Sequence, residues 1–262
     1  MQFIVLDLEW NQPVSYQSSA YRKVGDSLLF EVIQIGAAKL NERLEIVDTI
    51  SVPICPTHYM TIHPRVKRMT GLNMDVLADA PNFPEGMEQF HQWCGEDCVF
   101  VTWGCDDVSV LQQNVDFFRF DKPLPKMYDL QRLYAAAMKL SGQTALKTAM
   151  EALEIQPEED RAFHNAEHDA YYTALVMRKL PDPLAVLGYD PPCNYSGRSP
   201  LEALSVGVSM KDTDVVFRCN IVTVTEDEPY AEKTILDHSS GEISTQSPGP
   251  AITRLTRAFS GS

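Results

Sequence analysis

Short apolar segments mark the first strands of a sheet. Residues 3–6 form an uninterrupted apolar run with β-branched members, which is typical of a central strand covered on both faces. Two longer strand-like stretches follow, at residues 28–40 and 44–52, with a polar turn at residues 41–43 between them. The polar residues 11–27 predict a loop. The pattern therefore predicts that the chain begins with three antiparallel strands.

Strand and helix patterns then alternate up to residue 181. Val108, Leu111, Val115 and Phe118 recur at spacings of three and four residues, which predicts an amphipathic helix. A last helix ends near Leu180, before two prolines. The remaining expected elements are short helices within 53–85, helices at 83–94, 131–140 and 144–153, and strands at 98–103 and 126–130. This order predicts an α/β domain with a mixed central sheet flanked by helices, covering residues 1–181.

The pattern of apolar and polar residues changes after Pro183. Proline, glycine and serine interrupt the pattern, and one strand-like stretch stands out at residues 215–224. About 80 residues with a single strand pattern make a poor independent core. We therefore expect a small appended fragment at 182–246 and a disordered tail at 247–262.

Composition excludes several classes of protein. The chain has 22 basic and 36 acidic residues and a net charge of −14, which argues against a protein that coats nucleic acid through bulk charge. No apolar run approaches the ~18 residues of a membrane span. The first ten residues carry two acids and lack the basic start of a secretory signal, so the six cysteines are interpreted as reduced thiols in a cytoplasmic protein. Zinc binding by Cys94, Cys98, Cys105 and His91 is the alternative for some of them.

Two acidic residues at the end of the first strand are candidates for metal binding. Asp7 and Glu9 are two positions apart, so a strand places their side chains on one face. Two carboxylates on one face of a buried strand repel each other unless a cation lies between them, and Mg²⁺ prefers carboxylates together with substrate phosphate. The alternative is that the strand emerges into solvent at this point.

Two later segments carry the same kind of chemistry. Asp107 lies where a strand ends and a helix begins, the region where ligands gather in α/β sheets. Its neighbour Asp106 fits helix capping better, and capping is the alternative for the whole motif. Asp169 lies on the last helix, five residues after a loop histidine, His164, while a polar helix start is the alternative there. His168, inside the helix, is the weaker histidine candidate.

Four carboxylates and one histidine suit phosphoryl hydrolysis with two metal ions. Two cations about 4 Å apart need several carboxylates, and a histidine that titrates near neutral pH can accept the proton of the attacking water. The order Asp7-x-Glu9, Asp107, His164-x4-Asp169 resembles the DEDDh family of 3′→5′ exonucleases, in its sporulation-inhibitor-like and histone-mRNA-exonuclease-like branch. Further matching segments are E-V-I-Q-I-G-A at 31–37, M-T-G-L at 69–72, W-G-x-x-D at 103–107, Y-D-L-Q at 128–131 and H-N-A at 164–166.

The resemblance implies a fold, an activity and residue roles. The fold would be the three-layer ribonuclease H-like domain, and the activity release of nucleoside 5′-monophosphates from the 3′ ends of single-stranded RNA or DNA. The four carboxylates would hold two Mg²⁺ or Mn²⁺ ions, with His164 as general base and as part of the substrate site. The other residues implied in the pocket for the 3′-terminal nucleotide are Leu8, Trp10, Asn11, Met69 and Thr70.

Two basic or aromatic features near this pocket have alternative interpretations. Trp10 could stack on a base or pack in the core. Arg65, Lys67 and Arg68 form the densest basic cluster of the domain, and could guide a phosphate backbone or be a solvated face. RNA and DNA both remain open as substrates, because no motif indicates contacts to a 2′-hydroxyl. The acidic balance suggests substrates that are short or already single-stranded, and it leaves room for tethering by a protein partner.

The C-terminal part resembles a second family. Residues 187–191, 195–203 and 217–223 are similar to archaeal-type cofactor-independent phosphoglycerate mutases, and Tyr195, Arg198 and Arg218 keep their family context. Two arginines could bind a phosphate there. The metal-binding aspartate motif, the serine nucleophile region and the later metal-binding histidines of that family are missing, so we expect no mutase activity. The remaining alternative for the whole chain is a binding module that holds a nucleic-acid end or a protein without cutting.

Overall fold

The computed structural model describes residues 1–25 and 27–180 and four short strands after them, at 206–210, 215–219, 233–236 and 243–246. The chain divides into two compact units, Met1–Pro200 and Leu201–Ser262, and each is described by itself. Among the described residues, no helix is both long and apolar enough to cross a membrane.

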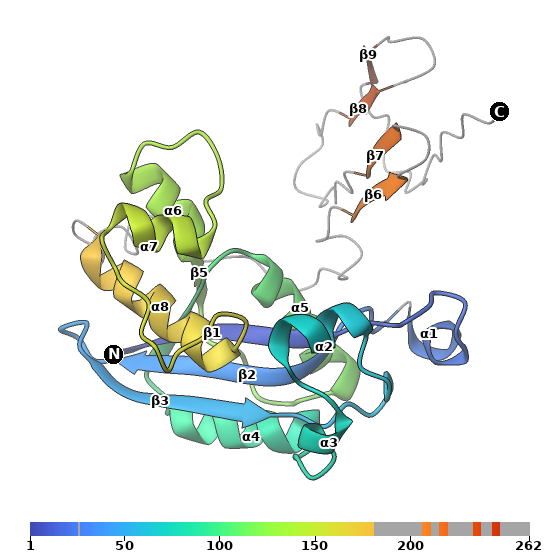
Figure 1. Ribbon diagram of the computed structural model, residues 1–262, viewed down its shortest axis with the longest axis horizontal. Helices are drawn as coiled ribbons and strands as arrows, with labels where there is room; N and C mark the ends of the chain where they lie inside the picture. The colour runs from blue at the N-terminus through green and yellow to red at the C-terminus, as the bar shows by residue number, and fades with distance from the viewer. Residues whose placement is uncertain (26, 181–205, 211–214, 220–232, 237–242, 247–262) are drawn as a thin grey trace. The chain divides into compact units, whose positions relative to one another are not determined.

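The first unit is built on one five-stranded mixed sheet (Figure 1). Its strands lie in the order β3-β2-β1-β4-β5, so the apolar N-terminal strand is central, as its sequence predicts. β2 pairs antiparallel with β1 and β3, whereas β4 pairs parallel with β1 and β5. The strands are β1 (Gln2–Asn11), β2 (Glu31–Leu40), β3 (Ile46–Pro53), β4 (Cys98–Thr102) and β5 (Met127–Asp129).

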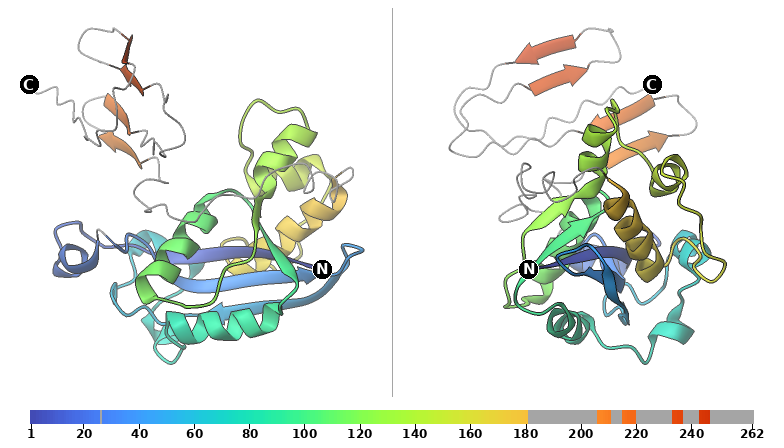
Figure 2. Two further views of the ribbon diagram at one scale, coloured as in Figure 1. Left: turned by 180° about the vertical axis from the view of Figure 1, so that it is seen from behind. Right: turned by 90° about the vertical axis from the view of Figure 1, so that its left-hand side faces the viewer.

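Helices cover both faces of this sheet, which confirms the predicted three layers (Figure 2). The alternation along β1 divides the core: Phe3 and Val5 pack with α6, α7 and α8, while Ile4, Leu6 and Leu8 pack with α4 and α5. These helices are α4 (Phe83–Cys94), α5 (Asp106–Phe118), α6 (Leu130–Ala137), α7 (Leu146–Ala152) and α8 (Ala166–Lys179).

Three short helices complete the first unit: α1 (Ser19–Val24), α2 (Pro64–Thr70) and α3 (Met74–Leu77). The prediction of a loop over residues 11–27 was wrong for α1. This helix buries no side chain and begins at Ser18, whose hydroxyl accepts the Tyr21 N–H at 3.1 Å. A six-residue helix without a buried face leaves no apolar period in the sequence, so local capping is the only signal for it.

The expected strands at 28–40 and 44–52 are shorter in the structure. β2 begins at Glu31, and Leu28 and Leu29 are buried outside the strand. β3 begins at Ile46, because Leu44 adopts a left-handed conformation with φ of 59° in the preceding turn.

Four strands of the second unit are described. β6 (Val206–Met210) pairs antiparallel with β7 (Val215–Cys219), and β8 (Lys233–Leu236) pairs antiparallel with β9 (Ile243–Gln246). The strand expected at 215–224 is therefore present for its first five residues. Residues 220–224, Tyr195, Arg198 and the tail expected at 247–262 lie outside the described residues.

Candidate active site

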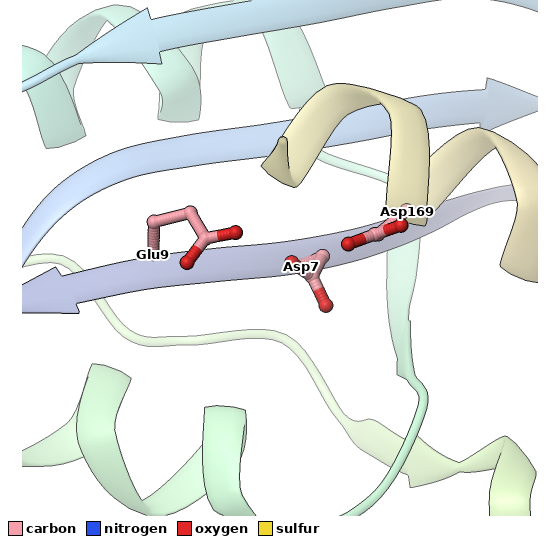
Figure 3. A group of neighbouring side chains, drawn as sticks. All are labelled: Asp7, Glu9 and Asp169. Carbon is pink, nitrogen blue, oxygen red and sulfur yellow. The ribbon is translucent and has the colours of Figure 1, made fainter. Parts of the chain in front are cut away.

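Asp7 and Glu9 lie on the face of the sheet that α8 covers. They continue the alternation of Phe3 and Val5, whose side chains pack toward that helix. β4 pairs with β1 only as far as Val5, so both carboxylates lie beyond this pairing. Asp169, in the first turn of α8, meets them there (Figure 3). One ligand oxygen from each of the three residues lies within 4.8 Å of the other two.

A glycine in β2 allows α8 to approach the sheet this closely. Gly36 pairs with Asp7 in the register of the two strands. A Cβ atom at position 36 would lie 1.9 Å from the backbone nitrogen of Glu167 and 2.0 Å from the carbonyl carbon of Ala166. The side chain of Gln34, on the same strand, accepts the Ala166 N–H at 3.2 Å. β2 therefore seats the first turn of α8 and with it Asp169.

Asp107 reaches the site from the other side of β1. It lies in the first turn of α5, just after β4, and is 5% exposed. Its Oδ1 accepts the backbone N–H of Leu8 at 3.0 Å, the residue between Asp7 and Glu9. Asp106, one position earlier, is exposed to solvent. The structure thus brings Asp107 to the acidic cluster and leaves Asp106 outside it.

The carboxylates of this cluster oppose one another's ionisation. Burial, followed by the charges of Asp107, Asp169 and Glu9, raises the pKa of Asp7 well above its usual range. Burial and the charge of Asp169 raise the pKa of Glu9 to about 7.

The two aspartates from the helices show the same direction of shift. Burial raises the pKa of Asp107 to about 8, against a hydrogen bond from Leu8 N–H that lowers it. The pKa of Asp169 is also raised by burial. A site of this kind needs protons or a cation to compensate its charge.

The donor atoms fit a hard divalent cation. Asp169 Oδ1 is buried and has no hydrogen-bond partner among the described residues, while Oδ2 accepts the His164 N–H at 2.9 Å. Carboxylate oxygens are the ligands that Mg²⁺ and Mn²⁺ prefer. Within the described part of the chain, Asp7, Glu9 and Asp169 are the group of acidic, histidine or cysteine side chains that converges closely enough to hold an ion. Cys94, Cys98, Cys105 and His91 form no such group there, which leaves the zinc alternative without support.

His164 stands at the edge of the cluster on a firmly held loop. Its backbone is left-handed, with φ of 65°, and its side chain is exposed. Side chains of α8 hold the preceding residues: Tyr172 donates from its hydroxyl to Arg161 O at 2.7 Å, and a His168 ring nitrogen lies 2.9 Å from Ala162 O. His168 therefore contacts the loop that carries His164.

The residues expected in the nucleotide pocket differ in accessibility. The Leu8 and Asn11 side chains are buried. Asn11 donates to Tyr59 O at 2.8 Å and Thr61 O at 3.1 Å and accepts the His63 N–H at 2.9 Å, so its side chain bonds within the protein.

The other pocket residues are closer to solvent. Thr70 is half-buried and donates to Val66 O at 3.0 Å. Trp10 is also half-buried, with its ring centroid 6.0 Å from that of Phe30. Met69 is exposed. Met69 and part of Trp10 are thus the surfaces open to a ligand.

The sheet order, the covering helices and the acidic cluster at the central strand define a ribonuclease H-like nuclease domain. Residues 23–177 match the family model described as "Exonuclease", and the chain belongs to this family. The relation to exonucleases expected from the sequence is therefore confirmed.

Two solved exonuclease structures have a similar fold. The first is described as "3′-end specific recognition of histone mRNA stem-loop by 3′-exonuclease" and has a TM-score of 0.58 and 20% identity. It matches 68% of this chain, and this chain covers 63% of its length. The second is the nuclease domain of a DEDDh family 3′-exonuclease bound to rAMP, with a TM-score of 0.57 and 20% identity over 68% of this chain and 90% of that chain.

The C-terminal resemblance is also confirmed. Residues 181–261 match the family model of 2,3-bisphosphoglycerate-independent phosphoglycerate mutase. The mutase of Methanosarcina barkeri (strain Fusaro / DSM 804) is 48% identical over 63 residues, which are 24% of this chain and 14% of that protein. The chain thus covers about a seventh of the length of this relative.

Proposed function

We propose that residues 1–181 form a metal-dependent 3′→5′ exonuclease that releases nucleoside 5′-monophosphates from single-stranded RNA or DNA. The observation that carries this proposal is the meeting of Asp7, Glu9 and Asp169, with Asp107 bound to the backbone between the first two. Asp169 Oδ1 is buried without a partner among the described residues, which supports a cation as the partner of this oxygen. Membership of the exonuclease family gives the reaction class.

The residues divide the work of hydrolysis among them. Asp7, Glu9, Asp107 and Asp169 hold two Mg²⁺ or Mn²⁺ ions, which when bound lower the pKa of a water molecule and stabilise the leaving oxygen. His164 accepts the proton of the attacking water, because its imidazole is exposed on a loop whose backbone is anchored to Asp169. Met69 and Trp10 contact the 3′-terminal nucleotide.

We infer the 3′ polarity of the reaction from the similarity to solved structures. Two structures with this fold are described by their 3′-exonuclease activity, one with RNA recognition at a 3′ end and one with bound rAMP. Those ligands belong to those proteins, and for this chain a free 3′ end of RNA or DNA is our proposed substrate. We place the protein in the cytoplasm, with its cysteines reduced.

The remainder of the chain is proposed to be catalytically silent. We assign residues 182–246 to a mutase-like fragment and 247–262 to a tail. Since the chain covers 14% of the matched mutase, we propose that it lacks mutase activity. Consumption of 3-phosphoglycerate by the purified, metal-loaded protein in a coupled assay would refute this assignment.

The experiment that tests the nuclease function uses matched RNA and DNA oligomers, each labelled at the 5′ end. Incubation with Mg²⁺ or Mn²⁺ should give a ladder that shortens from the 3′ end, and EDTA should abolish it. The faster oligomer identifies the substrate class. Absence of products with both metals, from a folded protein, would instead favour a module that binds nucleic-acid ends without cutting them.

Replacement of Gly36 with Ala should damage the site through α8. The new Cβ collides with backbone atoms of residues 166 and 167, so the first turn of the helix has to move and carry Asp169 with it. Displacements of about 1 Å at a catalytic group can reduce the rate by about a hundredfold, which is the loss of kcat/KM we expect. Gly142→Ala is the matched control, because nothing lies within 4 Å of its added Cβ. Equal activity of the two variants would contradict this role of Gly36.

The adjacent residues Asp106 and Asp107 allow a test of which aspartate belongs to the site. Asp107→Ala should abolish hydrolysis, since this buried carboxylate touches the strand that carries Asp7 and Glu9. Asp106→Ala should leave the rate within about twofold of the wild type, as expected for an exposed surface substitution. The reverse pattern in a nuclease assay would show that Asp106, and not Asp107, belongs to the site.

A further inference from the structure

Helix α2 carries three positive charges that no described acidic side chain pairs with. Arg65, Lys67 and Arg68 are all exposed, and none forms an ion pair with any described residue. Elsewhere acidic residues do find partners: Lys122 pairs with Glu88 and Arg161 with Glu158. In a chain with a net charge of −14, a cluster of cations without an acidic partner in the described part of the chain can attract an anion.

This basic helix is tied to the strand that carries the acidic cluster. Asn11 follows Glu9 by two residues, and its side chain bonds to Tyr59 O, Thr61 O and His63 N–H. His63 is the N-cap of α2 and accepts the Arg65 N–H at 3.2 Å. Asn11 thus fixes the start of α2 beside the carboxyl-terminal part of β1 (Figure 1).

A buried carboxylate of β2 binds the segment that leads into α2. Glu31 is 1% exposed and accepts the N–H groups of Thr57 at 2.6 Å and Tyr59 at 2.7 Å. The segment that leads into α2 is therefore bonded to both β1 and β2. Such a support keeps the positive charges of α2 at a fixed position relative to Asp7 and Glu9.

Two exposed methionines lie close to these charges in the sequence. Met69 at the end of α2 is 40% exposed, and Met60, in the segment before the helix, is 54% exposed. Flexible, polarisable methionine side chains adapt to varied partners. A segment that carries both exposed cations and exposed apolar side chains suits a single strand, whose phosphates and bases are both accessible.

We propose that α2 binds the phosphates of the strand upstream of the scissile 3′ end, through Arg65, Lys67 and Arg68. This inference rests on the proposed exonuclease function and makes its substrate a single strand of several nucleotides. The acidic cluster and the overall negative charge repel a polyanion, and α2 supplies the local attraction that holds it. Short substrates without upstream phosphates gain nothing from this surface.

The test compares two triple variants with the same change of charge. R65Q/K67Q/R68Q removes the surface, and R43Q/K126Q/K147Q removes three exposed cations located elsewhere, in the turn before β3, before β5 and on α7. The full chain is titrated into a fluorescein-labelled single-stranded 12-mer in EDTA at several salt concentrations. We expect the α2 variant to bind about tenfold more weakly, with a salt slope lower by about 2, because each phosphate contact on a single strand contributes ~0.7. The control should bind like the wild type.

Hydrolysis of a short substrate separates this inference from the proposed function. The p-nitrophenyl ester of thymidine 5′-monophosphate has one phosphodiester and no upstream strand, so the α2 variant should cleave it at the wild-type rate. Equal weakening of 12-mer binding in both triple variants, or unchanged binding in the α2 variant, would overturn the role of α2. Failure of the wild type to cleave this ester and both the RNA and the DNA oligomer would count against the exonuclease function, while the binding titration would still decide the role of α2.

Discussion

Replacing Asp7 with asparagine is expected to reduce hydrolysis by about a thousandfold, which corresponds to about 4 kcal/mol of transition-state stabilisation. Asn has the size of Asp, so the variant should fold normally. It lacks the negative charge of Asp, so it should bind cations poorly. Asp7 is the carboxylate on which the charges of Asp107, Asp169 and Glu9 all act. The measurement is kcat/KM on a labelled oligomer with saturating Mg²⁺.

The same substitution should raise the melting temperature of the metal-free protein. Burial and its acidic neighbours raise the pKa of Asp7, so in the folded protein Asp7 carries either a repelled charge or a proton that the unfolded chain has released. Asn removes both costs, and active sites commonly cost stability in this way. Asp79→Asn is the control, since this carboxylate is exposed on the surface and distant in sequence from every member of the cluster. Activity of Asp7→Asn within tenfold of the wild type would remove Asp7 from the proposed machinery.

The second large effect is a loss of stability of the metal-free protein as the pH rises. Carboxyl groups in an unfolded chain titrate near pH 4. In the folded protein the pKa of Glu9 is raised to about 7 and that of Asp107 to about 8. Between the carboxyl pKa of the unfolded chain and the raised pKa values of the folded protein, the folded state keeps protons that the unfolded state has released. The free energy of unfolding of the protein therefore falls as the pH rises from about 4 to about 8.

The melting temperature measured in EDTA from pH 5 to pH 8 checks this dependence. The difference between wild type and Asp7→Asn isolates the cluster from other titrating groups, and the wild type should show the steeper decline. Mg²⁺ should raise the melting temperature more at pH 8 than at pH 5, because it binds the deprotonated carboxylates. Parallel pH profiles of the two proteins would contradict the coupling between these carboxyl groups.

Local patterns in the sequence predicted the scaffold well. The helix expected at 83–94 has these bounds in the structure, because an Asn82 capping box and apolar positions at helical spacing define it. The period-2 argument for Asp7 and Glu9 also places them on one face, since β1 is regular up to the irregularity between Glu9 and Trp10. α1 escaped prediction because no buried face marks it.

Local sequence patterns could not predict the contacts that assemble the site. Gly36 and Ala166 are 130 positions apart, and no periodicity indicates that the backbones approach until a Cβ no longer fits. Asn11 was expected in the nucleotide pocket, yet its buried side chain bonds to the segment before α2. The available signals were a glycine within a β-branched strand and an asparagine just past the acidic pair. The role of each residue is determined by a contact with a residue distant in the sequence, which the sequence pattern does not identify.

Binding of Mn²⁺ tests the central claim most directly. Electron paramagnetic resonance of free Mn²⁺ during titration of the full chain measures how many ions bind and how tightly. We predict two ions per chain for the wild type, and loss of this binding in Asp7→Asn and in Glu9→Gln but not in Asp106→Asn. Identical binding curves for all four proteins would place the cations elsewhere and contradict the assignment of the acidic cluster as the metal centre of an exonuclease.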